Sequence, residues 1–144
     1  MNISILNKSN NPNPTYKTNG SSGLDIRAFL EEDIVIDPNE RTLVPTGIYL
    51  ELPEALEAQI RPRSGLSLNY GITVLNTPGT IDSDYRGEIS VILVNLSNKP
   101  FRISNGDRIA QIIIARVEKI TWNNIKILKK TERGEGGFGS TGKT

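Results

Sequence analysis

The chain has 144 residues, a length that suits one domain. Its 17 basic and 16 acidic side chains leave a formal net charge of only +1, so no basic field is present for binding nucleic acid. It contains neither cysteine nor histidine, which excludes disulfides, cysteine nucleophiles, Ser-His-Asp catalysis and histidine-bound zinc, and leaves carboxylates, lysine, tyrosine or the amino terminus as general bases. No signal-peptide pattern opens the sequence and no apolar run nears the roughly 20 residues that span a bilayer, so we expect a soluble, cytoplasmic protein without a membrane partner.

Short alternating runs, separated by turn residues, fill the first half of the chain. Residues 3–6 predict a first strand, and the polar residues 7–22, rich in Asn, Ser, Pro and Gly, predict a long loop. Further strands are expected at 23–28, 33–37, 48–52 and 58–63, and only 53–59 and 64–70 offer a turn or two of helix. Many short strands at close spacing predict a single all-β domain, either a barrel or a sandwich.

Two later runs, residues 89–96 and 109–117, are apolar on both alternating faces. A strand that is apolar on both faces is usually buried on both. Self-association would cover the second face, and a strand beneath a loop in a sandwich core explains the pattern equally well. Gln111 interrupts the second run, and its amide needs partners from a subunit interface or from a ligand.

The segment 79–88 lies between apolar runs at 72–75 and 89–94, and this arrangement predicts a β-hairpin with a short connection. The segment carries two carboxylates, Asp82 and Asp84, which would share one face of an extended strand. A carboxylate held in this way can act as a general base or a metal ligand. The alternative is that Asp and Gly are present only as common turn formers.

Two further stretches carry groups that suit phosphate. Residues 61–67 end a strand and enter a possible helical turn, where backbone amides, Ser64 and two arginines form a candidate anion site, although exposed arginines are usually only solvated. Residues 131–144 are too rich in glycine to pack alone and should be disordered when free, which by itself fits an inert terminus. The groups in it that could close over a base and a polyphosphate are Arg133, Gly137, Phe138, Gly139, Ser140 and Thr141.

Five segments together resemble the ordered motifs of the trimeric dUTPases, the deoxyuridine 5′-triphosphate nucleotidohydrolases. They are residues 22–28, 61–66, 79–88, 106–111 and 133–142, in the family's order, and they span nearly the whole chain. Ser22 and Glu135 fall where the family varies. The resemblance implies a homotrimer of distorted jelly-roll β-barrels of the β-clip type, with active sites shared between subunits. Residues 1–130 would form the barrel, and residues 131–144 would form an arm that closes a neighbour's site.

The resemblance also implies a reaction, the hydrolysis of dUTP to dUMP and pyrophosphate. This reaction keeps uracil out of DNA and supplies dUMP for dTMP synthesis. Asp82 would activate the water that attacks the α-phosphorus. Magnesium would be held mainly by the substrate phosphates, and Asp25 would approach it through water. An ion pair of Asp25 with Arg27 or Arg108 is the structural alternative for that carboxylate.

The same resemblance assigns the parts of the nucleotide to groups of residues. Phosphate oxygens would be held by Arg63, Ser64, Gly65 and Gln111, and closed by Arg133, Ser140 and Thr141. The uracil-binding segment runs from Asn76 to about Ser90 and includes Thr80, Ile81 and Asp82. Tyr85 would lie against the deoxyribose, and Phe138, between Gly137 and Gly139, would stack over uracil.

Three rival functions are compatible with parts of this pattern. A dCTP deaminase of the same fold needs a glutamate at the pyrimidine, for which Glu88 is the candidate, but that group commonly lacks a glycine-rich arm. A nucleotide-controlled switch that binds a protein partner would need a surface for that partner, and no inserted loop supplies one. A purely structural β-protein leaves the tail unexplained.

Overall fold

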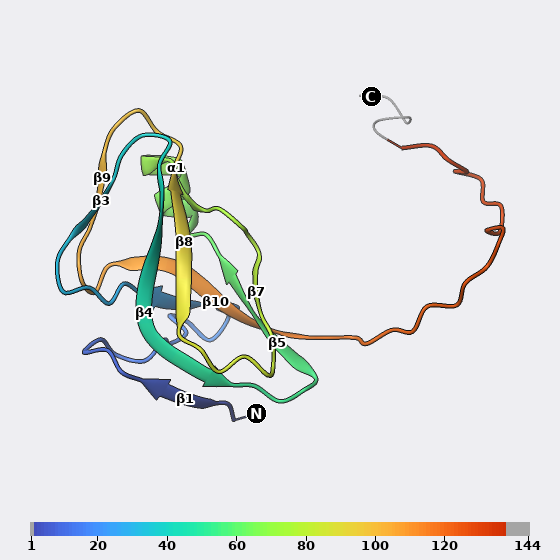
Figure 1. Ribbon diagram of the computed structural model, residues 1–144, viewed down its shortest axis with the longest axis horizontal. Coiled ribbons are helices and arrows are strands. Elements are labelled where there is room, and N and C mark those ends of the chain that lie inside the picture. The colour runs from blue at the N-terminus through green and yellow to red at the C-terminus, as the bar shows by residue number, and fades with distance from the viewer. Residues whose placement is uncertain (1, 138–144) are drawn as a thin grey trace.

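The computed structural model describes residues 2–137, and within them the chain forms ten β-strands and one short helix (Figure 1). Most strands belong to two four-stranded antiparallel sheets, and β3 and β9 form a separate ribbon. The first sheet has the order β1 (Ser4–Asn7), β4 (Arg41–Glu51), β8 (Ile89–Asn95), β6 (Ile72–Val74). The second has the order β2 (Leu24–Arg27), β10 (Arg108–Arg116), β5 (Leu56–Arg61), β7 (Gly79–Ile81). The ribbon joins β3 (Ile34–Ile36) to β9 (Phe101–Ile103), and the helix is α1 (Ser64–Tyr70).

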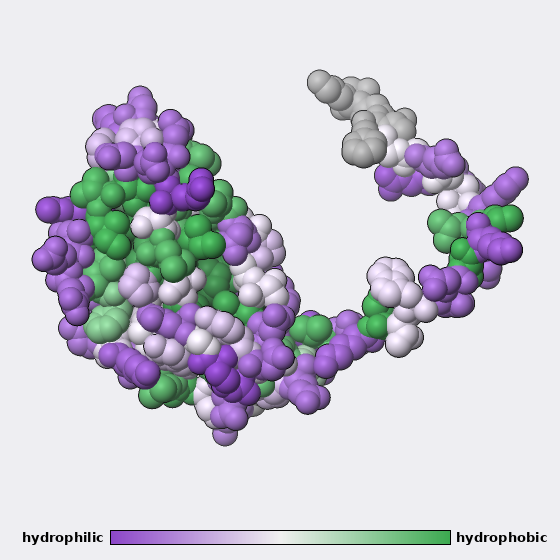
Figure 2. Space-filling model, viewed as in Figure 1, coloured by the Kyte–Doolittle hydropathy of each residue, from purple (hydrophilic) through white to green (hydrophobic). Residues whose placement is uncertain are grey.

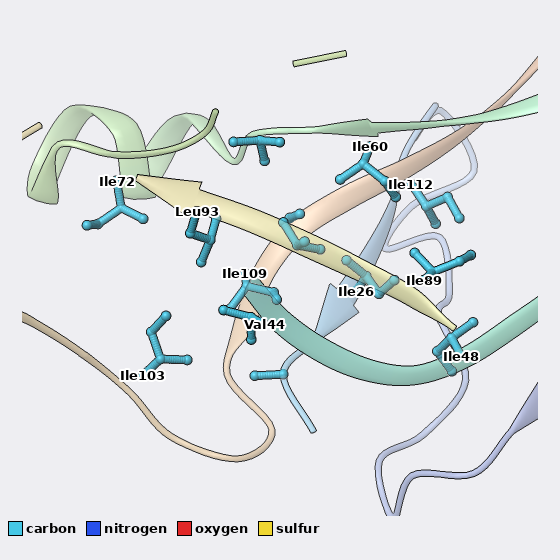
Figure 3. Close-up of a cluster of buried hydrophobic side chains, with 14 of the residues drawn as sticks. Ile26, Val44, Ile48, Ile60, Ile72, Ile89, Leu93, Ile103, Ile109 and Ile112 are labelled. Atoms are coloured by element: carbon cyan, nitrogen blue, oxygen red, sulfur yellow. The ribbon is translucent and has the colours of Figure 1, made fainter. Parts of the chain in front are cut away.

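One hydrophobic core lies between the two sheets. Its members are mainly isoleucine and valine, whose branched side chains suit the pleated surface of a sheet. Figure 3 shows residues of both sheets in this cluster, among them Ile26, Ile60 and Ile112 from one sheet and Val44 and Leu93 from the other. Full burial of one such side chain stabilises the fold by about 1.5–3 kcal/mol. The all-β, jelly-roll-like class predicted from the sequence is confirmed.

Most of the predicted elements are present, but the strand expected at 48–52 is longer and begins at Arg41. The long loop before β2 and the helix at 64–70 are confirmed, but residues 53–59 form no helix. There, the amide of Leu56 donates to the carbonyl of Pro53 in a tight turn, and β5 begins at once. Strand β9 has no counterpart among the predicted strands, because three residues beside Pro100 are too few to show an alternation.

The connection between β6 and β8 corrects the predicted hairpin. The two strands do pair, with Ile72 opposite Asn95 and Val74 opposite Leu93. Their link is not short, however, because it runs through residues 75–88 and contains β7, which pairs with β5 of the other sheet. Asp82 and Asp84 follow β7 in an irregular stretch, so the alternation of a strand does not apply to them.

The body of strands ends at Arg116, and residues 117–137 belong to no helix or strand. The amide of Val117 still donates to the carbonyl of Ala55, and beyond it the chain runs away from the body (Figure 1). The predicted boundary at residue 130 is not tested by this arrangement and stays a prediction. Within residues 2–137, the helical part of the fold is too short to cross a membrane.

Candidate active site

A row of polar side chains crosses the outer face of the sheet formed by β2, β10, β5 and β7. Gln111 on β10 lies opposite Asp25 on one side and Arg61 on the other. Directly opposed residues of antiparallel strands share a face, so these three side chains lie next to one another. The neighbouring positions Ile26, Ile60 and Ile112 point into the core, which fixes the row on the outside.

Asp25 is the centre of an ion-pair network in this row. Its Oδ1 lies 3.2 Å from Arg63 Nε, and its Oδ2 lies 2.8 Å from Arg108 Nη1. Arg63 Nη1 also donates to the carbonyl of Arg108 at 3.1 Å. The network therefore joins β2 and β10 to the residue that precedes α1. Arg27, the other predicted partner, instead donates to the carbonyl of Gly106.

Burial acts on the pKa of Asp25 in the direction opposite to its partners. The side chain is only 9% exposed, and this desolvation raises the pKa. The hydrogen bond from Arg108 and the charges of Arg63 and Arg108 lower it by more, so the pKa of Asp25 lies below its ordinary value. The carboxylate is thereby held in its charged form, with one guanidinium on each oxygen.

The start of α1 lies directly after this network. Ser64 and Gly65 open the helix, and Arg63 before them has an extended backbone. No side chain caps the first turn, and the turn contains no acidic residue. Its amides are therefore available to an anionic ligand, and the nearby arginines add positive charge.

The connection after β7 carries the residues predicted to bind uracil and deoxyribose. A turn closes it, since the amide of Tyr85 donates to the carbonyl of Asp82 at 3.1 Å. The Tyr85 hydroxyl donates to the carbonyl of Glu88 at 3.0 Å, and Arg86 Nη1 donates to the carbonyl of Ser83 at 2.7 Å. Asp82 is exposed, so its carboxylate can reach a ligand outside the sheet.

A bulge in β4 anchors the far end of this connection. Glu88 Oε1 accepts hydrogen bonds from the amides of Thr46, at 3.0 Å, and Gly47, at 2.7 Å, where the pairing of β4 with β8 shifts register. Gly47 has φ +69°, and a Cβ there would lie 2.8 Å from Ser9, so only glycine fits. This role of Glu88 was not predicted, although a glycine within a strand pattern is a known signal of a bulge.

A family model described as dUTPase matches residues 9–142. The chain belongs to the dUTPase family. A Finegoldia magna protein named deoxyuridine 5′-triphosphate nucleotidohydrolase is 58% identical over 142 residues, with 99% of each chain covered. A Cytophaga hutchinsonii protein of the same name is 57% identical over 141 residues, with 98% of this chain and 92% of the relative covered.

Solved dUTPases share the fold. The dUTPase of Staphylococcus bacteriophage 80alpha, solved as a mutant with dUpNHpp, superimposes with a TM-score of 0.87 over 98% of each chain at 22% identity. A mutant dUTPase of phage phi11 of S. aureus, described with a coordinated structural Mg(II) ion, gives a TM-score of 0.81 over 90% of this chain and all of the other, at 18% identity. At these identities the likeness concerns the fold alone.

The single chain brings only part of the predicted dUTPase site together. Asp25, Arg63 and Gln111 meet through the network and the sheet register, and Thr80 lies on β7 at the edge of the same sheet. Ser90 lies on β8 in the other sheet, opposite Pro45. Arg133 and Gly137 lie in the segment beyond β10, where Arg133 Nε donates to the carbonyl of Gly136. Asn76 lies between β6 and β7, and Ile81 is the last residue of β7. Phe138, Gly139, Ser140 and Thr141 lie outside the described residues.

The donor set of this dUTPase fits a magnesium ion that is bound mainly by a substrate. In the part of the chain that the structure describes, no three acidic side chains gather into a metal-binding group. Asp25 is the one predicted metal contact, and both of its oxygens already face guanidinium groups. Magnesium is usually bound through one or two carboxylates, water and substrate phosphates, so contact through water fits the observed geometry.

Proposed function

We infer that this chain is a dUTP diphosphatase, which hydrolyses dUTP to dUMP and pyrophosphate. The observation that carries this conclusion is the match to relatives of that name, at 57–58% identity over nearly the full length of both chains. The reaction removes dUTP before it can place uracil in DNA, and it supplies dUMP for dTMP synthesis.

Asp82 is the general base in this proposal. Its exposed carboxylate accepts a proton from water as the water oxygen forms a bond to the α-phosphorus. The bond between the α-phosphorus and its bridging oxygen to the β-phosphate breaks, and pyrophosphate leaves. General-base assistance of this kind contributes roughly 10²–10⁴ in rate. The turn from Asp82 to Tyr85 and the anchor at Glu88 support this assignment, since they fix the backbone that carries Asp82 while its side chain stays exposed.

The phosphates bind where α1 begins. Ser64 and Gly65 offer uncapped amides, and Arg63 and Gln111 add a guanidinium and an amide. The pairing of Arg63 with Asp25 holds that guanidinium before the substrate arrives, which lowers the cost of ordering it in the transition state. From the arm, Arg133, Ser140 and Thr141 complete the contacts with the outer phosphates.

The base and sugar bind along the connection that contains β7. Main-chain groups of Thr80, Ile81 and Asp82, with the Asn76 amide and Ser90, recognise the uracil edge and penalise cytosine by mispaired polar groups. Close contact with this segment excludes the methyl group of thymine. Tyr85 lies flat on the deoxyribose and excludes a ribose hydroxyl, and Phe138, flanked by Gly137 and Gly139, stacks on the base.

Magnesium is the proposed cofactor. It would be bound mainly by triphosphate oxygens, with Asp25 reaching it through water, and it supplies neutralisation of charge on the phosphates. A mutant dUTPase of phage phi11 with a coordinated structural Mg(II) ion supports the choice of metal. The fully paired state of Asp25 favours contact through water over direct ligation.

The proposed assembly is a homotrimer in which each active site receives the arm, residues 131–144, from a neighbour. The segment that leads to the arm carries large apolar side chains with no cover in the single chain; Trp122 is 86% exposed and Ile127 is 85% exposed. Figure 2 shows apolar residues at intervals along this segment as well as on the body. An apolar pocket of about 280 Å³ between β1, β4 and β10 offers surface of matching character. Contact with a second copy would cover both surfaces.

The deaminase alternative loses support from the position of Glu88. One oxygen of that carboxylate accepts hydrogen bonds from both amides of the bulge in β4, so the side chain has a structural role rather than a contact with a pyrimidine base. Family membership and the hydrolase names of the relatives point the same way.

The test is release of pyrophosphate from dUTP by the full-length protein with magnesium, in parallel with dTTP, dCTP and UTP. We expect rapid release from dUTP and release from the other three that is slower by orders of magnitude. Ammonia is followed in the dCTP reaction. Ammonia from dCTP without pyrophosphate from dUTP would assign the chain to the deaminases instead.

A further inference from the structure

Three side chains that face the proposed nucleotide site each lie against a glycine. The pairs are Gln111 with Gly23, Asn76 with Gly79, and Tyr85 with Gly87. We propose that Gly23, Gly79 and Gly87 are positioning residues, and that each controls recognition of a different part of the nucleotide. The inference rests on the proposed function, because it takes dUTP as the ligand of the site.

Backbone conformation does not explain these three glycines. Among the described residues, positive φ angles at glycine occur at Gly47, Gly71, Gly106 and Gly134. The three glycines of the proposal lie outside that set, so an alanine could adopt their backbone angles. What they have in common is that a Cβ would take space from a side chain assigned to the nucleotide site.

Gly87 has the closest neighbour. A Cβ at this position would lie 2.5 Å from Tyr85 Cζ and 2.9 Å from Cε2, and closer still to the hydroxyl oxygen. The ring is therefore folded back over Gly87, and its hydroxyl donates to the carbonyl of the next residue, Glu88. Tyr85 is 44% exposed, so an alanine at 87 would turn the ring out into solvent without disturbing the core. The ring that closes off the 2′ position of the sugar would then be displaced.

Gly79 lies beneath Asn76. A Cβ on Gly79 would be 3.2 Å from Asn76 Nδ2 and 3.4 Å from Ile60 Cβ. Ile60 belongs to the core and cannot move freely, whereas Asn76 is exposed and can. A methyl group at 79 would therefore shift the Asn76 amide by a few tenths of an ångström, and this amide is proposed to recognise the base.

Gly23 lies beside Gln111. A Cβ on Gly23 would be 3.3 Å from both Cβ and Cδ of Gln111 and 3.5 Å from Nε2. The contact runs along the side chain, so the amide of Gln111 is held in the polar row beside Asp25. A methyl group at 23 would displace an amide that is proposed to contact phosphate, which every nucleoside triphosphate carries.

The experiment compares three single variants, Gly23→Ala, Gly79→Ala and Gly87→Ala, with Gly20→Ala as the matched control. A Cβ on Gly20 meets nothing within 4 Å. For each protein, kcat and KM are measured with dUTP, UTP, dTTP and dCTP in the presence of magnesium, and thermal unfolding is recorded.

Each variant has its own expected signature. Gly87→Ala lowers the preference for dUTP over UTP by about ten-fold or more. Ten-fold is the lower end of the discrimination between substrates that one contact in a binding pocket provides. Gly79→Ala lowers the preference for dUTP over dTTP or dCTP by about three-fold or more, with the UTP ratio unchanged. Gly23→Ala raises KM for dUTP and leaves every preference unchanged. The control Gly20→Ala matches the wild type.

Two results would overturn the proposal. One is that all three variants keep the wild-type preferences and KM. The other comes from a Tyr85→Ala background, in which the ring is absent and Gly87→Ala should change the UTP ratio less than about two-fold. An equal change in both backgrounds means that Gly87 acts without Tyr85. Failure of the wild type to hydrolyse dUTP would instead refute the proposed function, so the two failures are distinct.

Discussion

Apolar side chains form a buried core in the barrel but are exposed in the segment that follows it, residues 117–137. In the barrel, isoleucine, valine and leucine from both sheets pack into one core. In residues 117–137, side chains of the same kind lie exposed on a stretch without helix or strand. Both regions contain apolar residues, but within one chain only those of the barrel pack into a core.

The comparison separates two parts of the proposed machinery. The proposed base Asp82 follows β7, and it belongs to the barrel together with the network around Asp25 and the uncapped start of α1. Of the proposed closing residues, the structure describes Arg133 and Gly137, and the Nε of Arg133 donates to the carbonyl of Gly136 within the segment itself. Changes in the barrel should therefore affect chemistry and stability, whereas changes in the segment should affect assembly and closure.

The largest effect is expected from Asp82→Asn, which tests the barrel's part in the chemistry. We expect kcat to fall by roughly 10²–10⁴ because the amide cannot accept the proton from water. Binding of a non-hydrolysable dUTP analogue, measured by calorimetry, should persist. Asp84→Asn, in the same exposed stretch, is the control. Equal kcat in Asp82→Asn and the wild type would remove Asp82 from the role of base.

Removal of residues 131–144 comes next and tests the segment alone. We expect a fall in kcat/KM for dUTP of about 10² or more, because the outer phosphates and the base lose their cover. The temperature of unfolding should stay close to that of the full chain, since none of residues 131–137, the removed residues that the structure describes, belongs to the core. Full activity in the shortened protein would show that the arm is dispensable.

A third substitution, Trp122→Ala, tests whether the exposed apolar residues of the segment form subunit contacts. Truncation of a tryptophan at the centre of an interface costs about 2–4 kcal/mol, so the assembly should dissociate at higher protein concentration than the wild type. Analytical ultracentrifugation over a dilution series measures this. Val35→Ala, at an exposed position of the β3–β9 ribbon, serves as the control. Identical dissociation curves for all three proteins would argue against the interface.

The smallest effect concerns the stability of the barrel. Because the folded pKa of Asp25 is lowered, its ion pairs stabilise the fold above the unfolded pKa of about 3.9, and this stabilisation is lost as the pH falls through the lower folded value. Asp25→Asn should cost about 1.5–3 kcal/mol at neutral pH, the range for hydrogen bonds to charged groups.

The difference between Asp25→Asn and the wild type should shrink as the pH drops below about 4. Denaturant unfolding at several pH values measures it. Asp33→Asn breaks a more exposed pair with Arg102 and should cost no more than about 1 kcal/mol. A pH-independent difference for Asp25→Asn would contradict the ion-pair explanation.

Patterns among neighbouring residues predicted the strands and the helix that depend on those residues alone. Alternating residues identified β2 and the final part of β4. The doubly apolar run at 89–96 identified a strand, β8, that is buried on both faces over its second half. A turn or two of helix was expected at 64–70 after a strand end, and the helix found there stops at Gly71, which has φ +67°. These features depend on residues close together in the chain.

Features set by distant contacts could not be predicted in the same way. The hairpin expectation failed because β7 pairs with β5, and no local pattern shows which strand edge is free. Arg27 and Arg108 were equal candidates for Asp25. In the structure Arg108 of β10 makes the ion pair, and Arg63, which precedes α1, makes a second one that no local pattern indicated. The link between Glu88 and the bulge joins residues 41 and 42 positions apart.

The most direct test of the shared site combines the two damaged regions in one assembly. Asp82→Asn lacks the base but keeps its arm, and the shortened chain keeps the base but lacks residues 131–144. The two proteins are co-refolded in equal amounts, and pyrophosphate release from dUTP is compared with each protein alone. Random association pairs an intact Asp82 with a neighbour's intact arm in about one quarter of the sites, so activity should return to about that fraction of the wild type. A mixture no more active than its components would contradict a site closed by the arm of another subunit.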